Sequence, residues 1–225
     1  MKLMLFGVTG GTGAQLLTQA LAAGHQVTAV ARDPARIPVT DPGAQLTVLP
    51  GDVLAPETPE AAEAAEAWRQ AVTGHDAVLS CLGSTDRKHP TTVYSEGTRN
   101  IVEAMRASGV HRLLCLSSAG LEVTPAVPLP QRLVTRYVIQ RLYRHGYADM
   151  ARMESFVRSP AADGTVWTVV RPPMLTDGPL TGTYRTAENA ALERPKSLSR
   201  ADLAHYLLTH VDDRRAHRAV VEIAY

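Results

Sequence analysis

The feature that most constrains the fold of this chain is the alternation of short apolar runs with helical segments. Five runs rich in Val, Leu and Ala occur between residues 2 and 116, separated by glycines, prolines or helix-forming segments. The runs are continuously apolar, which is typical of parallel strands covered on both faces. We therefore predict an α/β fold in which a doubly wound parallel sheet carries helices on both faces. The predicted strands are Lys2–Phe6, Gln26–Ala31, Leu46–Leu49, Asp76–Cys81 and Arg112–Leu116.

The segments between these runs predict the helices. Residues 12–23, 59–72 and 93–107 have helical periodicity or composition, and Gly24 and Gly109 stand where the first and third helices would end. The pattern is looser after residue 120. The elements predicted there are helices at 129–144, 148–157 and 199–211, with Ser199 as the N-cap of the last, and strands at 166–170 and 220–223.

The length of 225 residues suits a single domain. We expect its cofactor part to span about residues 1–120 and its substrate-side elements about residues 121–225, including a small C-terminal substrate cap. With a strand order of 3-2-1-4-5-6, a ligand crevice would open at the carboxyl ends of the strands, beside the first strand.

The composition argues against several classes of partner. The formal net charge is +1, so we expect no nucleic-acid partner, and the apolar runs are too short to predict a membrane partner. Cys81 and Cys115 lie in predicted strands without Cys-x-x-Cys spacing, which favours buried free thiols in a reduced, cytoplasmic protein. A disulfide between adjacent strands is the alternative. The histidines are dispersed, and we predict no metal site.

The stretch from Gly7 to Gly13 reads Gly-Val-Thr-Gly-Gly-Thr-Gly, with G-x-x-G-x-x-G spacing instead of the common dinucleotide spacing G-x-G-x-x-G. It lies between the first predicted strand and the first helix, where glycines bring backbone amides up to a phosphate. Thr9 and Thr12 add hydroxyls that can donate to phosphate oxygens. We therefore predict a Rossmann-like dinucleotide site, with a purely structural turn as the alternative.

Arg32 follows the second predicted strand, where an acid would hold the ribose 2′-hydroxyl of NAD(H). A guanidinium at this place suits a 2′-phosphate, and Arg36 adds a second cation, so we predict NADP with NADPH preferred over NADH. Two ordinary surface arginines are the alternative. The full set of predicted cofactor-binding residues is Gly7, Thr9, Gly10, Gly11, Thr12, Gly13, Arg32, Arg36, Asp52, Val53, Leu82, Gly83, Ser84, Ser117 and Pro172.

Together with Arg32, Gly51-Asp52-Val53 and Cys81-Leu82-Gly83, the glycine motif resembles the atypical short-chain dehydrogenase/reductase group with NAD(P)-binding, NmrA-like domains. Within that group the chain is most similar to the flavin reductase/biliverdin-IXβ reductase family. The resemblance implies one Rossmann domain, NADPH as hydride donor, and flavins such as FMN or related planar acceptors as substrates. It rests on His89–Val93, Ser95–Val102, Ser117–Ala119, Pro172-Pro173 and Pro179–Tyr184.

The chain departs from this group at its proton donors. Most short-chain dehydrogenases use Tyr-x-x-x-Lys, in which the lysine lowers the tyrosine pKa, but here Tyr147 is followed by Ala151. The lysine that many NmrA-like proteins carry four residues before a glutamate corresponds to Met150, and the family's histidine after the proline pair corresponds to Met174. Alcohol–ketone interconversion through a tyrosinate is therefore not expected.

The resemblance places Ser118 near the nicotinamide and the acceptor, so Ser118 is the predicted catalytic residue, with a hydroxyl that caps the next turn as the alternative. Met174, Arg171 and Tyr184 are the predicted substrate residues, and for Arg171 an ion pair with Glu154 is the alternative.

Two functions fit these residues. The first is an NADPH-dependent oxidoreductase that transfers hydride to a flavin, biliverdin-like or quinone-like acceptor. The second is a non-catalytic NADP(H)-binding sensor or regulatory protein of NmrA-like type, which the missing Lys and His also fit. We expect a small-molecule acceptor and either a monomer or a homodimer.

Overall fold

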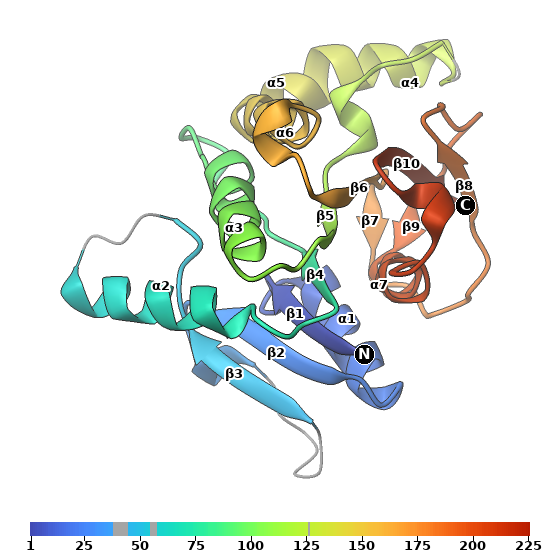
Figure 1. Cartoon of the computed structure of the whole chain (residues 1–225). Coiled ribbons are helices and arrows are strands. Elements are labelled where there is room, and N and C mark those ends of the chain that lie inside the picture. Colours follow the sequence, from blue (N-terminus) through green and yellow to red (C-terminus); the bar gives the residue numbers. More distant parts are fainter. Residues whose placement is uncertain (38–44, 55–57, 126) are drawn as a thin grey trace.

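The computed structural model describes residues 1–37, 45–54, 58–125 and 127–225. An eight-stranded sheet runs through the molecule in the order β3-β2-β1-β4-β5-β6-β10-β8 (Figure 1). Its first six strands confirm the predicted doubly wound parallel order. The bounds are β1 Lys2–Phe6, β2 Gln26–Ala31, β3 Leu46–Pro50, β4 Ala77–Ser80, β5 Arg112–Leu116, β6 Val166–Arg171, β8 Arg185–Glu188 and β10 Ala219–Ala224.

Helices cover both faces of the sheet and enclose two cores (Figure 1). Alternate residues of β1 enter different cores: Leu3 and Leu5 face one, and Met4 and Phe6 face the other. This two-sided burial explains why the strands read as continuous apolar runs. The first core lies beneath α1 (Gly11–Ala22) and α7 (Arg200–Thr209), and the second beneath α2 (Pro59–Ala71), α3 (Ser95–Ala107) and α6 (Arg144–Val157).

The helix ends predicted at Gly24, Gly109 and Ser199 agree with the structure, whereas the helix predicted at 148–157 begins earlier, at Arg144. Gly24 and Gly109 have φ angles of 76° and 68°, so each adopts the left-handed conformation that ends a helix. Ser199 is the N-cap of α7, because its side chain accepts a hydrogen bond from the Asp202 amide. Cys81 and Cys115 are buried free thiols, and burial raises the pKa of each to about 12.

The second half differs from the predicted pattern in two ways. The helix expected at 129–144 is divided into α4 (Leu129–Val134), a π-helical stretch η3 (Thr135–Ile139) and α5 (Gln140–Leu142). Additional short strands occur: β8 lies antiparallel to β10, and β7 (Leu175–Thr176) pairs with β9 (Leu198–Ser199). Short 3-10 turns complete the description: η1 Pro34–Arg36, η2 Ala119–Leu121, η4 Pro160–Ala162 and η5 Arg214–Ala216.

The predicted loop at 33–43 lies partly outside the described residues, which include only its beginning, η1. Within the described ranges, no helix is long and apolar enough to cross a membrane.

Candidate cofactor and acceptor site

The glycine loop follows β1 and turns tightly against the neighbouring strand. Gly7 has a φ angle of 77°, and a Cβ there would lie 2.3 Å from the Cys81 carbonyl oxygen at the end of β4. A Cβ on Gly13 would lie 2.1 Å from the Gly7 carbonyl oxygen. Because no side chain fits at these two positions, the backbone closes into a compact turn whose amides can approach a phosphate.

The first turn of α1 suits an anion. Gly10 is its N-cap and supplies no side-chain cap, and no acidic residue lies in the first turn. The N-terminal amides of a helix need a partner from outside, and the helix dipole makes a phosphate a favourable one. Thr9 and Gly10 are exposed beside these amides, whereas Thr12 is buried. The residues of this loop therefore fit the diphosphate of a dinucleotide.

The predicted ribose residues lie at the carboxyl end of β2. Arg32 directly follows this strand, Arg36 ends η1, and both side chains are exposed. Asp33, the acid next to Arg32, accepts a hydrogen bond from the Ala35 amide at 3.2 Å and so caps η1. Asp33 is exposed as well, but one of its carboxylate oxygens is engaged by the Ala35 amide. The two exposed guanidinium groups at this corner suit a phosphate better than a ribose hydroxyl.

The segments that follow β3 and β4 reach the same edge of the sheet. The Asp52 carboxylate accepts a hydrogen bond from the Leu54 amide at 3.0 Å, and the buried Val53 accepts one at its carbonyl from Asn100 at 2.7 Å. After β4 come Leu82, Gly83 and Ser84, of which Gly83 is exposed. The structure thus brings the predicted cofactor positions of four strand ends to one edge, since β1 to β4 are parallel.

Ser118 follows β5 and is tied to the end of β6. The Ala119 amide donates to the Pro172 carbonyl at 3.0 Å, and Ser118 Oγ accepts a hydrogen bond from the Gly120 amide at 3.2 Å. The capping role left open for Ser118 is therefore present. A hydroxyl that accepts one hydrogen bond can still donate another, so this cap leaves the Ser118 proton available.

Tyr147 is a site residue that the sequence reasoning missed. A Cβ built on Gly120 would lie 2.3 Å from Tyr147 Oη and 3.5 Å from Ser118 Oγ, so the two hydroxyls are neighbours. Tyr147 comes from α6, which packs beside η2. A search for a lysine four residues after the tyrosine could not find it, because the pairing depends on how α6 packs.

The two tyrosines at this edge are held as phenols. Burial raises the pKa of Tyr147, and hydrogen bonding with Ser118 opposes this only in part. Burial also raises the pKa of Tyr94, whose hydroxyl accepts a hydrogen bond from the Ser84 amide at 3.2 Å. A phenol with a raised pKa keeps its proton at neutral pH, so it can donate a proton but not act as a tyrosinate base.

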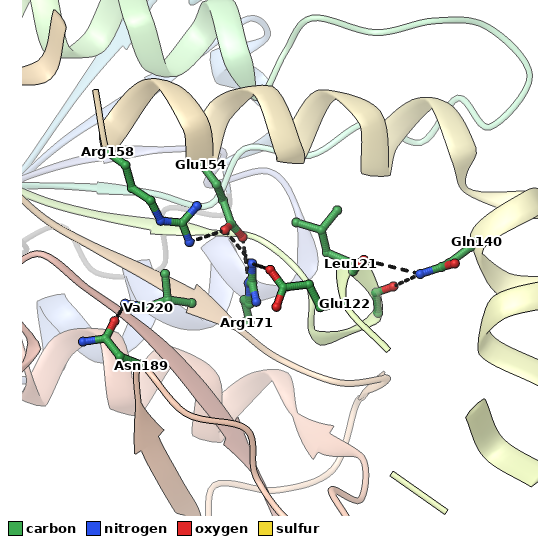
Figure 2. A network of polar contacts seen from close by, with 9 residues as sticks. Leu121, Glu122, Gln140, Glu154, Arg158, Arg171, Asn189 and Val220 are labelled. Atoms are coloured by element: carbon green, nitrogen blue, oxygen red, sulfur yellow. Dashed lines mark hydrogen bonds and ion pairs between the residues drawn. The ribbon is translucent and has the colours of Figure 1, made fainter. Parts of the chain in front are cut away.

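Arg171 lies in a buried ion pair, the alternative left open by the sequence (Figure 2). Its guanidinium contacts both carboxylate oxygens of Glu154 on α6, at 2.8 and 2.7 Å, and Glu122 at 2.8 Å. The Arg171 side chain is only 6% exposed, so almost all of its surface is in contact with other residues of the protein. Ser117 Oγ is also buried, without an aligned hydrogen-bond partner among the described residues.

The remaining predicted substrate residues lie in the segment after β6. Met174 is 75% exposed, and its carbonyl accepts a hydrogen bond from the Leu198 amide. Tyr184 packs against α7, with its hydroxyl 2.8 Å from His205 Nδ1. Neither side chain contacts Ser118 or Tyr147 in the described hydrogen bonds. Within the same described ranges, His, Cys, Asp and Glu side chains form no cluster of three or more that could hold a metal ion.

Comparisons with known proteins agree with this geometry. A family model described as NAD(P)H-binding matches residues 7–214. The Bacillus subtilis (strain 168) protein YwnB is 23% identical over 217 residues, which make up 95% of this chain and 92% of YwnB.

Solved structures share the fold. A short-chain dehydrogenase/reductase from Veillonella parvula in complex with NADP has a TM-score of 0.74 at 18% identity, with 100% of this chain and 94% of that chain covered. ChuY, an anaerobillin reductase from Escherichia coli O157:H7, has a TM-score of 0.75 at 19% identity, with 100% and 96% covered. Because the family model spans most of the sequence, the chain belongs to the NAD(P)H-binding family of Rossmann-fold proteins.

Proposed function

We propose that this protein is an NADPH-dependent reductase that transfers hydride to a planar conjugated acceptor, such as a flavin, a biliverdin-like tetrapyrrole or a quinone-like compound. NADPH, when bound, supplies the hydride. The glycine loop and α1 would hold its diphosphate, and Ser118 and Tyr147 would face the reacting end. ChuY, a structural relative that is an anaerobillin reductase, supports an acceptor of this kind.

The observation that carries the proposal is the pair of neighbouring hydroxyls, Ser118 and Tyr147, without a lysine to lower the tyrosine pKa. A phenol with a raised pKa donates a proton or a hydrogen bond but does not abstract a proton from an alcohol. Hydride addition to a conjugated acceptor leaves a delocalised anion that needs only weak acid help. The pair therefore suits reduction of such acceptors, with positioning as the main task of the protein.

We also propose a preference for NADPH over NADH, through Arg32 and Arg36. The support is that both guanidinium groups are exposed at the end of β2, while Asp33 caps η1. Kd values for NADPH and NADH, measured on the wild type and on Arg32→Ala, test it. We expect tighter binding of NADPH, and a loss in Arg32→Ala that is confined to NADPH. Tighter NADH binding that Arg32→Ala leaves unchanged would contradict the preference.

The activity test mixes purified protein with NADPH and one acceptor at a time: FMN, riboflavin, dichlorophenolindophenol or biliverdin. Oxidation is followed at the nicotinamide absorbance band. We expect turnover with at least one acceptor. Tight NADPH binding without turnover on any of them would overturn the proposal and favour the NADP(H)-binding sensor, the function that the missing Lys and His also fit.

Variants then test the hydroxyl pair. We expect Tyr147→Phe and Ser118→Ala to lower kcat by about tenfold to a hundredfold, at or below the usual range for a lost proton donor, with the Kd for NADPH unchanged. Tyr143→Phe is the matched control, because Tyr143 is the neighbouring tyrosine, with its ring tilted against that of Tyr147 at a centroid distance of 6.1 Å and covered by the Arg87 guanidinium. Wild-type turnover in Tyr147→Phe would remove that phenol from the reaction.

A further inference from the structure

Gly11 is the one glycine of the loop that the G-x-x-G-x-x-G spacing does not use. It is exposed, it begins α1, and its φ angle is not among the positive ones, so its backbone conformation does not require glycine. What its missing side chain permits is a contact with Arg200. A Cβ on Gly11 would lie 2.7 Å from Arg200 Cδ and 2.9 Å from Arg200 Nε.

The fold holds Arg200 in this place. Arg200 is the first residue of α7, and α7 packs along α1, where Gln19 Nε2 donates a hydrogen bond to the Ala201 carbonyl at 2.9 Å. The guanidinium therefore lies at the uncapped N-terminal end of α1, over the turn that the glycine loop forms. Among the described contacts, the Arg200 guanidinium is the cationic group that lies against the glycine loop.

The guanidinium has a partner that a ligand can replace. Arg200 Nη1 lies 2.6 Å from an Asp177 carboxylate oxygen. Asp177 follows β7 and Arg200 follows β9, and these two short strands pair in register, which sets the two side chains opposite each other. Asp177 is 90% exposed and Arg200 is 30% exposed, so the pair is solvated and weak.

We propose that Arg200 binds the diphosphate of NADP(H) and that Asp177 holds the guanidinium when the dinucleotide is absent. This inference rests on the proposed function. A diphosphate presents two charged groups at the end of α1, and a guanidinium binds phosphate oxygens by charge-assisted, bidentate hydrogen bonds. Phosphate is the stronger partner there because the amides of α1 favour the same anion, whereas an exposed carboxylate has only the guanidinium. Asp177 is thus a competitor of the cofactor.

The test separates this role from that of Arg32 by the choice of ligand. Kd values are measured for NADP⁺, NAD⁺ and 2′-AMP, the last of which carries the 2′-phosphate but no diphosphate. We expect Arg200→Gln to weaken NADP⁺ and NAD⁺ by a similar factor of about tenfold and to leave 2′-AMP unchanged. Arg32→Gln is the comparison variant, and it weakens NADP⁺ and 2′-AMP but not NAD⁺.

Asp177→Asn separates binding from a structural role of the ion pair. It removes the competing carboxylate, so we expect NADP⁺ to bind about two- to fivefold more tightly, the effect of losing a weak exposed pair. If the pair merely supported the loop, Asp177→Asn would weaken NADP⁺ as Arg200→Gln does, and that result would overturn the inference. Unchanged NADP⁺ binding in Arg200→Gln would also overturn it while the proposed function stands. A wild-type protein that binds no dinucleotide would overturn both.

Discussion

Arg171 and Glu154 bring two charges into the protein interior, where each is stable because the other is present. Their side chains are 6% and 2% exposed, and two hydrogen bonds of 2.8 and 2.7 Å join them. Burial alone would raise the pKa of Glu154, but hydrogen bonds from Arg171 and Arg158 outweigh it and hold this pKa below its usual value. The pair joins α6 to the end of β6, next to the segment that carries Ser118.

We expect Glu154→Gln to lower the free energy of unfolding by about 3 kcal/mol, because it leaves the Arg171 guanidinium buried with Glu122 as the one remaining carboxylate among its described contacts. Urea unfolding at neutral pH measures the loss. Glu122→Gln is the matched control: Glu122 is 61% exposed, and its removal should cost less than about 1 kcal/mol. Equal losses in the two variants would contradict a buried pair that determines local stability.

The Arg171–Glu154 pair also makes the folding stability depend on pH. Since the pKa of Glu154 is lower in the folded protein than the ordinary 4.5, the unfolded chain binds the proton more readily. The contribution of the ion pair to the free energy of unfolding is complete at pH values above the ordinary pKa of 4.5. It is lost as the pH falls through the lowered pKa that Glu154 has in the folded protein. Glu154→Gln should therefore lose less stability than the wild type on acidification below about pH 4.5. A parallel decline of the two proteins would contradict this sign.

Single residues also show what the sequence could reveal of the site. The loop glycines and Arg32 could be chosen as candidates because their signal is local: residue type at a fixed place after a strand. Tyr147 and Arg200 could not be chosen in this way, because helix packing, α6 against η2 and α7 against α1, brings each of them to the candidate site. For Arg171 the sequence offered two roles, and the ion pair with Glu154 is the one that the structure shows, because it depends on how α6 packs against the end of β6.

At the scale of elements, predictability followed the strength of the local pattern. The strands β1, β2, β4, β5 and β6 are largely buried and appear as continuous apolar runs, so they could be predicted from the sequence. The edge strand β3 is only partly buried, but its apolar residues Leu46, Val48 and Leu49 also marked it. β8, with the sequence Arg-Thr-Ala-Glu, is partly exposed and pairs only with β10, and β7 and β9 have two residues each. These short strands form because a neighbouring strand is available to pair with them. Their sequences show no periodic pattern of apolar residues that would predict a strand.

The cap of α7 provides a prediction at this scale. Ser199 Oγ accepts from the Asp202 amide at 2.9 Å and donates to the Pro179 carbonyl at 3.0 Å, and Ser199 is 1% exposed. We expect Ser199→Ala to lower the free energy of unfolding by about 1 to 2 kcal/mol, since it removes the cap and leaves a carbonyl unpaired. Urea unfolding monitored by circular dichroism measures the change.

Thr58 is the control, because it caps α2 through a 3.2 Å hydrogen bond from the Ala61 amide at an exposed site. Thr58→Ala should cost about 1 kcal/mol or less, since water can replace the lost partner. A Ser199→Ala variant that is no less stable than Thr58→Ala would show that burial of the α7 cap adds nothing.

At the scale of the whole molecule, one sheet separates two cores, and the proposed cofactor site lies along its carboxyl edge. The cofactor-binding residues predicted from the sequence follow β1, β2, β3, β4, β5 and β6, and Arg200 follows β9. A ligand bound there would contact elements that pack into both cores. Because the strands are hydrogen-bonded neighbours in one sheet, we expect thermal unfolding in a single transition and a shift of the whole transition on binding.

Saturating NADP⁺ should therefore raise Tm. At a free concentration about one hundred times Kd, binding adds about 2.7 kcal/mol to the free energy of unfolding, which corresponds to roughly 5 to 10 °C for a chain of this size. A thermal melt followed by tryptophan fluorescence reports it, since Trp68 and Trp167 are buried in the core beneath α2, α3 and α6. Adenosine, which has no phosphate, is the control and should leave Tm within about 1 °C at the same concentration. If NADP⁺ shifts the fluorescence transition but not the circular-dichroism transition, the site stabilises only part of the sheet, and the single-transition expectation is wrong.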